Sequence, residues 1–137
     1  YMDQIRISDE GFHALSQLLC SFKSLKFLYL GLYYLPELTE IGMKHLRQAL
    51  ESHPELHSLK LCYRTVSKAS GLEYLIQGIK STSKLTVLNF DSSYNYELDD
   101  KILEHITFPS SLQNLILDFG SCSHITKVGS KFLFQRI

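Results

Sequence analysis

The stretch LHSLKL, from Leu56 to Leu61, decides how the rest of the chain is interpreted. Leucine occupies its first, fourth and sixth positions, and the same L-x-x-L-x-L template returns in three other places. The four copies are LKFLYL at 25–30, LHSLKL at 56–61, LTVLNF at 85–90 and LQNLIL at 112–117. Apolar and variable positions that alternate over so few residues indicate β-strands. Four matches spaced 31, 29 and 27 residues apart therefore predict one strand in each unit of an internal repeat.

The segments between these strands predict helices. Each begins with an apolar residue followed by Ser, Thr or Asp, whose side chains accept hydrogen bonds from the free N–H groups of a first helical turn. The pairs are Ile7-Ser8, Leu38-Thr39, Val66-Ser67, Leu98-Asp99 and Ile125-Thr126. The fourth segment is shorter by about one helical turn, and Pro109 stands where a longer helix would continue. We therefore expect a truncated helix over about 99–107.

A glycine recurs near the start of these helical segments. It stands three residues after the capping residue at Gly11, Gly42 and Gly129, and one residue later at Gly71. In the truncated unit Ile102 replaces this glycine, and the replacement does not reduce helix stability if the position is helical. Further apolar residues follow at helical spacing, so each helix is expected to turn one apolar stripe toward the strands.

Each unit thus consists of a strand, a loop, a capped helix and a return turn, and no unit can bury its apolar face alone. In this pattern the chain resembles the leucine-rich-repeat family, specifically its ribonuclease-inhibitor-like class. The resemblance implies an α/β solenoid of about four and a half repeats, a horseshoe segment with parallel strands on the concave face and helices on the convex face. It covers nearly the whole chain, so we treat 1–137 as a single domain.

Two features depart from the pattern of that class. Where the class usually carries Asn or Cys after the strand, this chain has Tyr33, Arg64, Ser93 and Gly120, so we expect a divergent and less regular array. No complete leucine template precedes Ser8, and the apolar residues 132–134 have no following strand to cover them. We therefore expect a segment of a longer array, or an array whose ends are covered by partners in a larger complex.

The composition limits the function classes. Of the 137 residues, 45% are hydrophobic and 20% are charged, and 14 Lys and Arg residues balance 14 Asp and Glu residues. This balance gives no electrostatic argument for nucleic acid or an anionic membrane, and no apolar run approaches the roughly 20 residues of a membrane span. Cys20, Cys62 and Cys122 are odd in number and lack CxxC spacing, which favours reduced thiols. We expect an intracellular protein, cytoplasmic or in a cytoskeletal or organelle-associated complex.

No motif in the chain predicts a catalytic, cofactor-binding or metal-binding site. His53 and His57 are four residues apart, but Pro54 ends the helix between them, so they do not form a helical zinc motif. We interpret Cys62 as an inert thiol, although Lys60 and Arg64 flank it at two residues on either side. We therefore predict a non-enzymatic protein that holds no cofactor and no metal.

The positions between the strand leucines predict a binding surface on the concave face. Across the four strands they form three rows, which are Phe27, Ser58, Val87 and Asn114; Tyr29, Lys60, Asn89 and Ile116; and Gly31, Cys62, Asp91 and Asp118. The predicted partner-binding residues are Phe27, Tyr29, Ser58, Lys60, Cys62, Tyr63, Arg64, Val87, Asn89, Asp91, Asn114, Ile116 and Asp118. Aromatic residues beside arginine are typical of interface hot spots. The loop tyrosines Tyr33, Tyr34, Tyr94 and Tyr96 either extend this surface or pack the loops.

Three functions remain open at this point. The first is a non-catalytic module that binds a partner protein through the concave face and the post-strand loops. The second is a structural element or scaffold of a large multiprotein assembly, held through its ends and convex helices. The third is a GTPase-activating or GTPase-regulating role, because the resemblance includes such proteins. We expect Arg64 in a post-strand loop, where an arginine can stabilise phosphoryl transfer.

Overall fold

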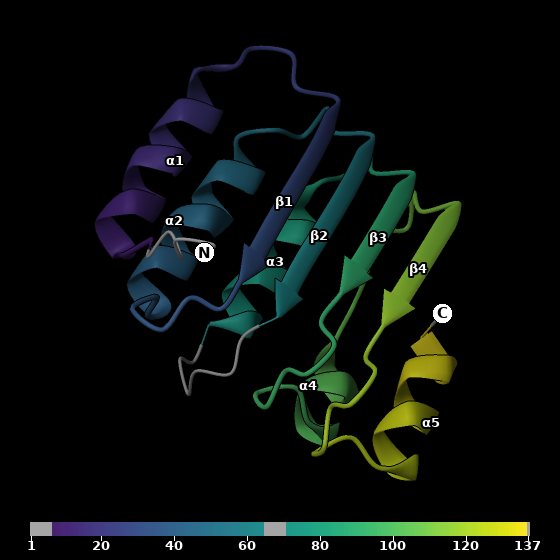
Figure 1. Cartoon of the computed structure of the whole chain (residues 1–137). Helices are drawn as coiled ribbons and strands as arrows, with labels where there is room; N and C mark the ends of the chain where they lie inside the picture. The colour runs from purple at the N-terminus through teal and green to yellow at the C-terminus, as the bar shows by residue number, and fades with distance from the viewer. Residues whose placement is uncertain (1–6, 65–70, 137) are drawn as a thin grey trace.

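The computed structural model of the chain describes residues 7–64 and 71–136, in which helices and strands alternate (Figure 1). The elements are α1 (Asp9–Ser21), β1 (Phe27–Tyr33), α2 (Glu40–Glu51), β2 (Ser58–Arg64), α3 (Leu72–Ser81), β3 (Val87–Asp91), α4 (Asp100–His105), β4 (Asn114–Asp118) and α5 (Lys127–Arg136). Each strand begins at the third residue of its leucine template and continues past its end. The four predicted strands are thereby confirmed, with each start two residues later than predicted.

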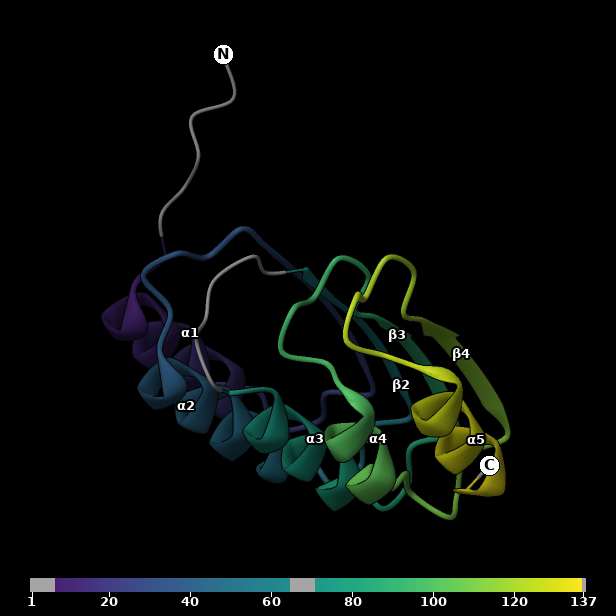
Figure 2. The same cartoon turned by 90° about the horizontal axis from the view of Figure 1, so that it is seen from below.

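The four strands form one open sheet in the order β1-β2-β3-β4, and all neighbours are parallel. The helices form a second layer on one side of this sheet (Figure 2). Within that layer α1 packs on α2, α2 on α3, and α4 on α5. We call the opposite side of the sheet, on which none of the described helices lies, the open face. This arrangement follows from the sequence pattern, because short strands joined by helical crossovers pair in parallel.

The core lies between the two layers and is deepest in the middle of the sheet. The helix-facing residues Leu59 and Leu61 of β2 and Phe90 of β3 are fully buried. The corresponding Leu30 of β1 and Leu117 of β4 are only partly buried. The difference arises because, within the described residues, β1 and β4 each have one neighbouring strand, whereas β2 and β3 have two.

Most of the predicted helix starts are confirmed, and one is wrong. Thr39 accepts a bond from the Ile41 amide at 3.1 Å, and Asp99 accepts one from the Ile102 amide at 2.9 Å. Thr126 accepts one from the Val128 amide at 3.1 Å, whereas Ser8 precedes α1 without such a bond. The cap of α3 is Gly71, not Ser67, which lies outside the described residues.

The shortened fourth helix is present as predicted. The α4 helix has six residues, against 13, 12 and 10 in α1, α2 and α3. Ile102 lies inside it and is partly buried, so the position that holds glycine in other units is helical here. The helix ends at His105, and its C-cap Ile106 has extended backbone three residues before Pro109, which cannot donate a helical hydrogen bond.

A carboxylate links neighbouring helices at their N-terminal ends. Asp9, the first residue of α1, accepts hydrogen bonds from the amide and the hydroxyl of Thr39 and from the Gly42 amide. Asp100, the first residue of α4, accepts the equivalent bonds from Thr126 and Gly129. We call these two arrangements the carboxylate staples. They satisfy free N–H groups of one helix with the side chain of the preceding one.

The staples predict a specific acid sensitivity. Burial favours a raised pKa for Asp9, but the hydrogen bonds from Thr39 and Gly42 outweigh it and the pKa lies below its ordinary value. The hydrogen bonds from Thr126 likewise lower the pKa of Asp100. A carboxylate with a lowered pKa in the fold stabilises it above an unfolded pKa of about 4, and this contribution is lost as the pH falls through the folded value.

We therefore expect the difference in unfolding free energy between pH 7 and pH 3 to be smaller in Asp9→Asn than in the wild type. Urea unfolding at both pH values measures it. The control is Glu10→Gln, which removes the neighbouring charge of α1 at an exposed position and is expected to leave the pH dependence unchanged. Equal acid sensitivity of Asp9→Asn and the wild type would contradict the staple.

Candidate protein-binding surface

The three predicted rows of open-face residues are confirmed as strand neighbours. In the observed register Phe27 pairs with Ser58, Ser58 with Val87, and Val87 with Asn114. The Tyr29 row and the Gly31 row follow the same register through all four strands. The leucine template alone therefore placed residues about 30 positions apart side by side.

An aromatic strip runs along β1 on the open face, formed by Phe27, Tyr29 and Tyr33. Their exposed fractions are 73%, 59% and 50%. Gly31 lies between Tyr29 and Tyr33 in the sequence, and the Tyr33 ring folds over it: a Cβ atom at Gly31 would lie 2.8 Å from Tyr33 Cε2. Because glycine has no Cβ, the Tyr33 ring can lie along the strand, and the aromatic strip is continuous.

Two cations of β2 lie beside the aromatic strip. Lys60 Nζ is 4.9 Å from the centre of the Tyr29 ring, and Arg64 Cζ is 5.9 Å from that of Tyr33. Both distances are in the range of cation–π attraction. Each cation thus covers the β2 side of one ring, while the rings stay about half exposed.

Asp91 of β3 holds the guanidinium of Arg64. Arg64 Nε donates to Asp91 Oδ2 at 3.0 Å and to Oδ1 at 3.1 Å, and Arg64 Nη2 also donates to Oδ2. The ion pair is therefore bidentate. The hydrogen bonds that Arg64 donates to Asp91 raise the pKa of Arg64. Burial favours a raised pKa for Asp91, but the hydrogen bonds from Arg64 and Ser93 outweigh it, so the pKa of Asp91 is lowered. Arg64 is the last residue of β2, so the expectation that it lies in a post-strand loop is wrong.

Two of the predicted binding residues are covered within the chain. Tyr63 is fully buried, and its hydroxyl lies 3.4 Å from Glu97 Oε1. Tyr63 is two residues after Leu61, so both side chains lie on the face of the sheet that packs against the helices. The strand period would have shown this if β2 had been predicted to extend past its template. Cys62 is 5% exposed, and its thiol shares a hydrogen bond with Tyr33, which raises the pKa of Tyr33. Neither side chain has free surface for a partner, so both are left out of the proposed surface.

The remaining predicted residues lie on the open face with graded exposure. Ser58, Val87 and Asn89 are half-buried in the middle of the sheet. Asn114, Ile116 and Asp118 of β4 are exposed, and Ile116 is 53% exposed. Of the two carboxylates in the β3–β4 half of the open face, Asp91 is paired with Arg64 and Asp118 is exposed.

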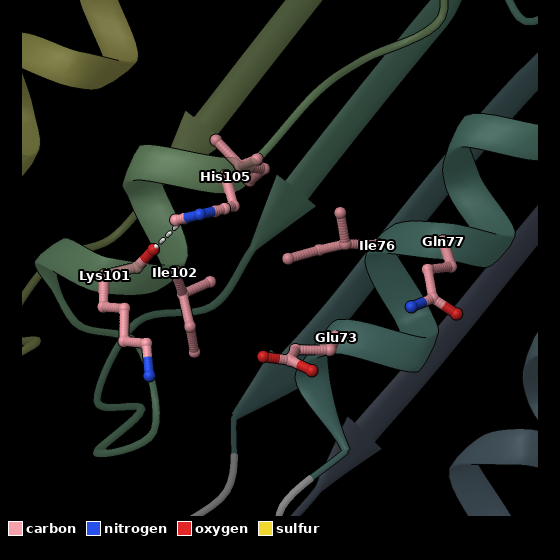
Figure 3. A pocket seen from close by; sticks show the side chains of 7 residues that line it. Glu73, Ile76, Gln77, Lys101, Ile102 and His105 are labelled. Carbon is pink, nitrogen blue, oxygen red and sulfur yellow. Dashed lines mark hydrogen bonds between the residues drawn. The ribbon is translucent and has the colours of Figure 1, made fainter.

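A groove on the helical layer was not predicted from the sequence. It measures about 410 Å³ and lies between α3 and α4 (Figure 3). Ile76 and Ile102 point into the space between the two helices, with Glu73 on the α3 side and Lys101 on the α4 side. On its other side α3 packs on α2, whereas α4, with six residues, is shorter than the ten-residue α3 beside which it lies. The predicted truncation of this helix was the signal that could have located the groove.

The histidines make local contacts. Buried His53 has its Nε2 2.8 Å from the Leu19 carbonyl, and His57 Nδ1 lies 2.6 Å from the Glu55 carbonyl. The rings of His13 on α1 and His45 on α2 contact each other, with ring centres 4.5 Å apart and ring planes tilted by 58°. Within 7–64 and 71–136, no group of three or more His, Cys, Asp or Glu side chains has an arrangement suited to a metal ion.

Comparison of the chain with protein-family models, curated proteins and solved structures finds no match. The resemblance to leucine-rich repeats therefore rests on the sequence pattern. In the part of the chain that the structure describes, every helix is too short or too polar to cross a membrane.

Proposed function

We propose that this protein is a leucine-rich-repeat module without catalytic activity that binds a partner protein through its open face and post-strand loops. The observation that carries the proposal is the aromatic strip, three rings each at least half exposed in one line beside Lys60 and Arg64. The repeat assignment is supported by one strand and one helix in each unit and by strand order that follows chain order.

The physical argument concerns side chains that the fold does not need. Large aromatic side chains are normally buried, because their transfer out of water is strongly favourable. On β1 they face away from the core, while the cations beside them hold their orientation. Aromatic residues and arginine dominate the energies of protein interfaces, and rings fixed in place lose little entropy on binding. The strip is therefore suited to recognition and has no evident role in stability.

We expect Tyr29→Ala and Lys60→Glu each to weaken partner binding at least about tenfold, or about 1.4 kcal/mol, which is more than most interface residues contribute. Both side chains are exposed, so the unfolding free energy should change by no more than about 1 kcal/mol. A photo-crosslinking residue at position 27 identifies the partner in cells, and titration with that purified partner measures the affinities. The control is Glu10→Ala, an exposed residue of α1 in the helical layer, which lies outside the proposed surface and should leave partner binding unchanged.

A second function is a structural element of a multiprotein assembly, contacted through its helical side. The groove between α3 and α4 and the exposure of Phe134 on α5, at 78%, favour it. A photo-crosslinking residue at Glu104, exposed on α4, tests this reading. Crosslinks from position 104 to stable neighbours, with none from position 27, would replace the first proposal by the second.

GTPase regulation is the third and least supported proposal. An arginine that stabilises phosphoryl transfer must reach the phosphate of its partner. Asp91 holds the guanidinium of Arg64 in a bidentate ion pair. The Arg64 side chain would have to break this ion pair before it could reach a phosphate.

A further inference from the structure

The helical layer has an opening between α3 and α4. Elsewhere in the described layer each helix packs on its neighbour, α1 on α2, α2 on α3 and α4 on α5, but α3 and α4 share no comparable contact. The sheet beneath is continuous, because β2 pairs with β3 and β3 with β4. The groove of about 410 Å³ lies at this opening (Figure 3). It is therefore a gap in the outer layer of the fold, above an unbroken sheet.

Isoleucine side chains form the apolar part of this groove. Ile106 is fully buried, whereas Ile76 of α3 and Ile102 of α4 pack against the core and stay partly exposed. Both of these side chains point into the space between the two helices (Figure 3). Removal of this apolar surface from water by a bound partner would be favourable.

Opposite charges lie on the two sides of the groove. Glu73 lines it from α3 and Lys101 from α4, and both side chains are exposed. Neither side chain forms an ion pair or a hydrogen bond with any residue in 7–64 and 71–136. Gln77, which also lines the groove, already accepts a hydrogen bond from Arg47 Nη1 at 2.9 Å. The free charges therefore complement a ligand that has a base beside Glu73 and an acid beside Lys101.

The surroundings of the groove favour a helix as its occupant. A small-molecule pocket encloses most of its ligand, whereas the charged side chains of this groove are exposed. An amphipathic helix lays one apolar row into a groove between helices and keeps its charged flanks on either side. Since α3 has ten residues, a helix of about the same length, or roughly 15 Å, spans the groove.

The described helices of the chain itself do not match this charge pattern. The α1 helix exposes Leu18 but has no lysine or arginine, and α5 exposes Phe134 but has no aspartate or glutamate. In α2, which exposes Ile41, Glu40 and Lys44 form an ion pair with each other at 3.1 Å. A helix of another protein is therefore a better match than a helix of a second copy.

We propose that the groove between α3 and α4 binds an amphipathic helix of a partner protein. The apolar row of that helix covers Ile76 and Ile102, its basic flank faces Glu73 and its acidic flank faces Lys101. The inference goes beyond binding at the open face, because it assigns a second partner surface on the opposite layer of the molecule and states the chemistry of the segment that fits it.

The test is a fluorescence anisotropy titration of the whole chain with a labelled fourteen-residue helical peptide. The peptide has leucine along one face, lysine on one flank of that face and glutamate on the other, and the wild type should bind it. Glu73→Lys and Lys101→Glu should each weaken binding about fivefold, since each replaces an attraction by a repulsion. The double variant should regain the affinity of the wild type, because the peptide can reverse its direction and so exchange its flanks.

Glu10→Lys is the matched control, because it makes the same charge reversal at an exposed position of α1, away from the groove. It should bind the peptide like the wild type. A peptide with glutamate on both flanks is the negative probe and should bind about fivefold more weakly. No binding of the first peptide, equal binding of the two peptides, or a double variant as weak as the single variants would each overturn the inference.

Self-association is the remaining alternative for this groove. A dimer of the wild type that Glu73→Lys abolishes would overturn the inference, because a second copy would then occupy the groove; sedimentation at several concentrations measures it. Tyr29→Ala and Lys60→Glu, on the open face, should leave peptide binding unchanged. The groove and the open-face function are therefore tested separately, and either can fail without the other.

Discussion

Replacement of Leu61 by alanine is expected to destabilise the protein by roughly 2–5 kcal/mol, the range for large-to-small changes in a packed core. Leu61 is fully buried in β2, between β1 and β3 and beneath the helices. The lost methyl groups leave a cavity that rigid neighbours on both sides cannot fill. Urea unfolding of the variant and the wild type under identical conditions measures the cost.

The same change at the equivalent template position of an edge strand should cost clearly less. Leu30 of β1 and Leu117 of β4 are only partly buried, so alanine removes less apolar surface from the core, and water replaces part of the lost contact. Leu30→Ala and Leu117→Ala therefore serve as controls of identical chemistry. Equal losses at all three positions would show that the core is not concentrated in the middle of the sheet.

Gly42→Ala is expected to destabilise the protein by about 1–3 kcal/mol, the usual cost of overpacking. A Cβ atom at Gly42 would lie 2.6 Å from Asp9 Oδ1, would press on Leu38 Cδ1, and would lie 3.3 Å from Phe12 Cβ. Asp9 would have to move and would lose its bond from the Gly42 amide. This outcome reverses the ordinary gain of up to about 1 kcal/mol when alanine replaces glycine inside a helix.

Gly11→Ala is the matched control for Gly42→Ala, at the same position of the first helical unit. Among the described residues its added Cβ would meet the side chain of Ile7 alone, with Cγ2 at 2.7 Å, and Ile7 precedes the helix, where its side chain can rotate about χ1 to make room. The variant should therefore be as stable as the wild type or more so. Thermal unfolding midpoints compare the two, and a rise for Gly42→Ala would show that the close approach of α1 and α2 is not rigid.

The sequence predicted the parts of the fold that depend on local pattern. The leucine template located all four strands and their register, because the side-chain period of two leaves one way to put Leu59 and Leu61 on the buried side. Capping residues located four helix starts, and Pro109 with the short spacing located the truncated helix. The cap of α3 was missed because Gly71 contributes no side chain to recognise.

The candidate surface was predicted in outline but not in its contacts. The open-face rows followed from alternation, yet the ring of Tyr33 over Gly31 and the pairing of Arg64 with Asp91 join residues from different strands. Such contacts depend on side-chain conformations that neighbouring units impose on one another. The burial of Tyr63 was misjudged because the template ended before the strand did.

By itself, then, the sequence determined which segments form strands and helices and which residues share a face of the sheet, because both follow from short-range periodicity and from the chemistry of caps. Only the tertiary structure decided how equivalent positions differ. Leu61 is buried and Leu30 partly exposed, Gly42 is crowded and Gly11 is not, and Tyr34 and Tyr94 have left-handed backbone. The physical reason is that burial, crowding and loop geometry depend on the neighbouring unit, which is about 30 residues away in the chain and in direct contact in space.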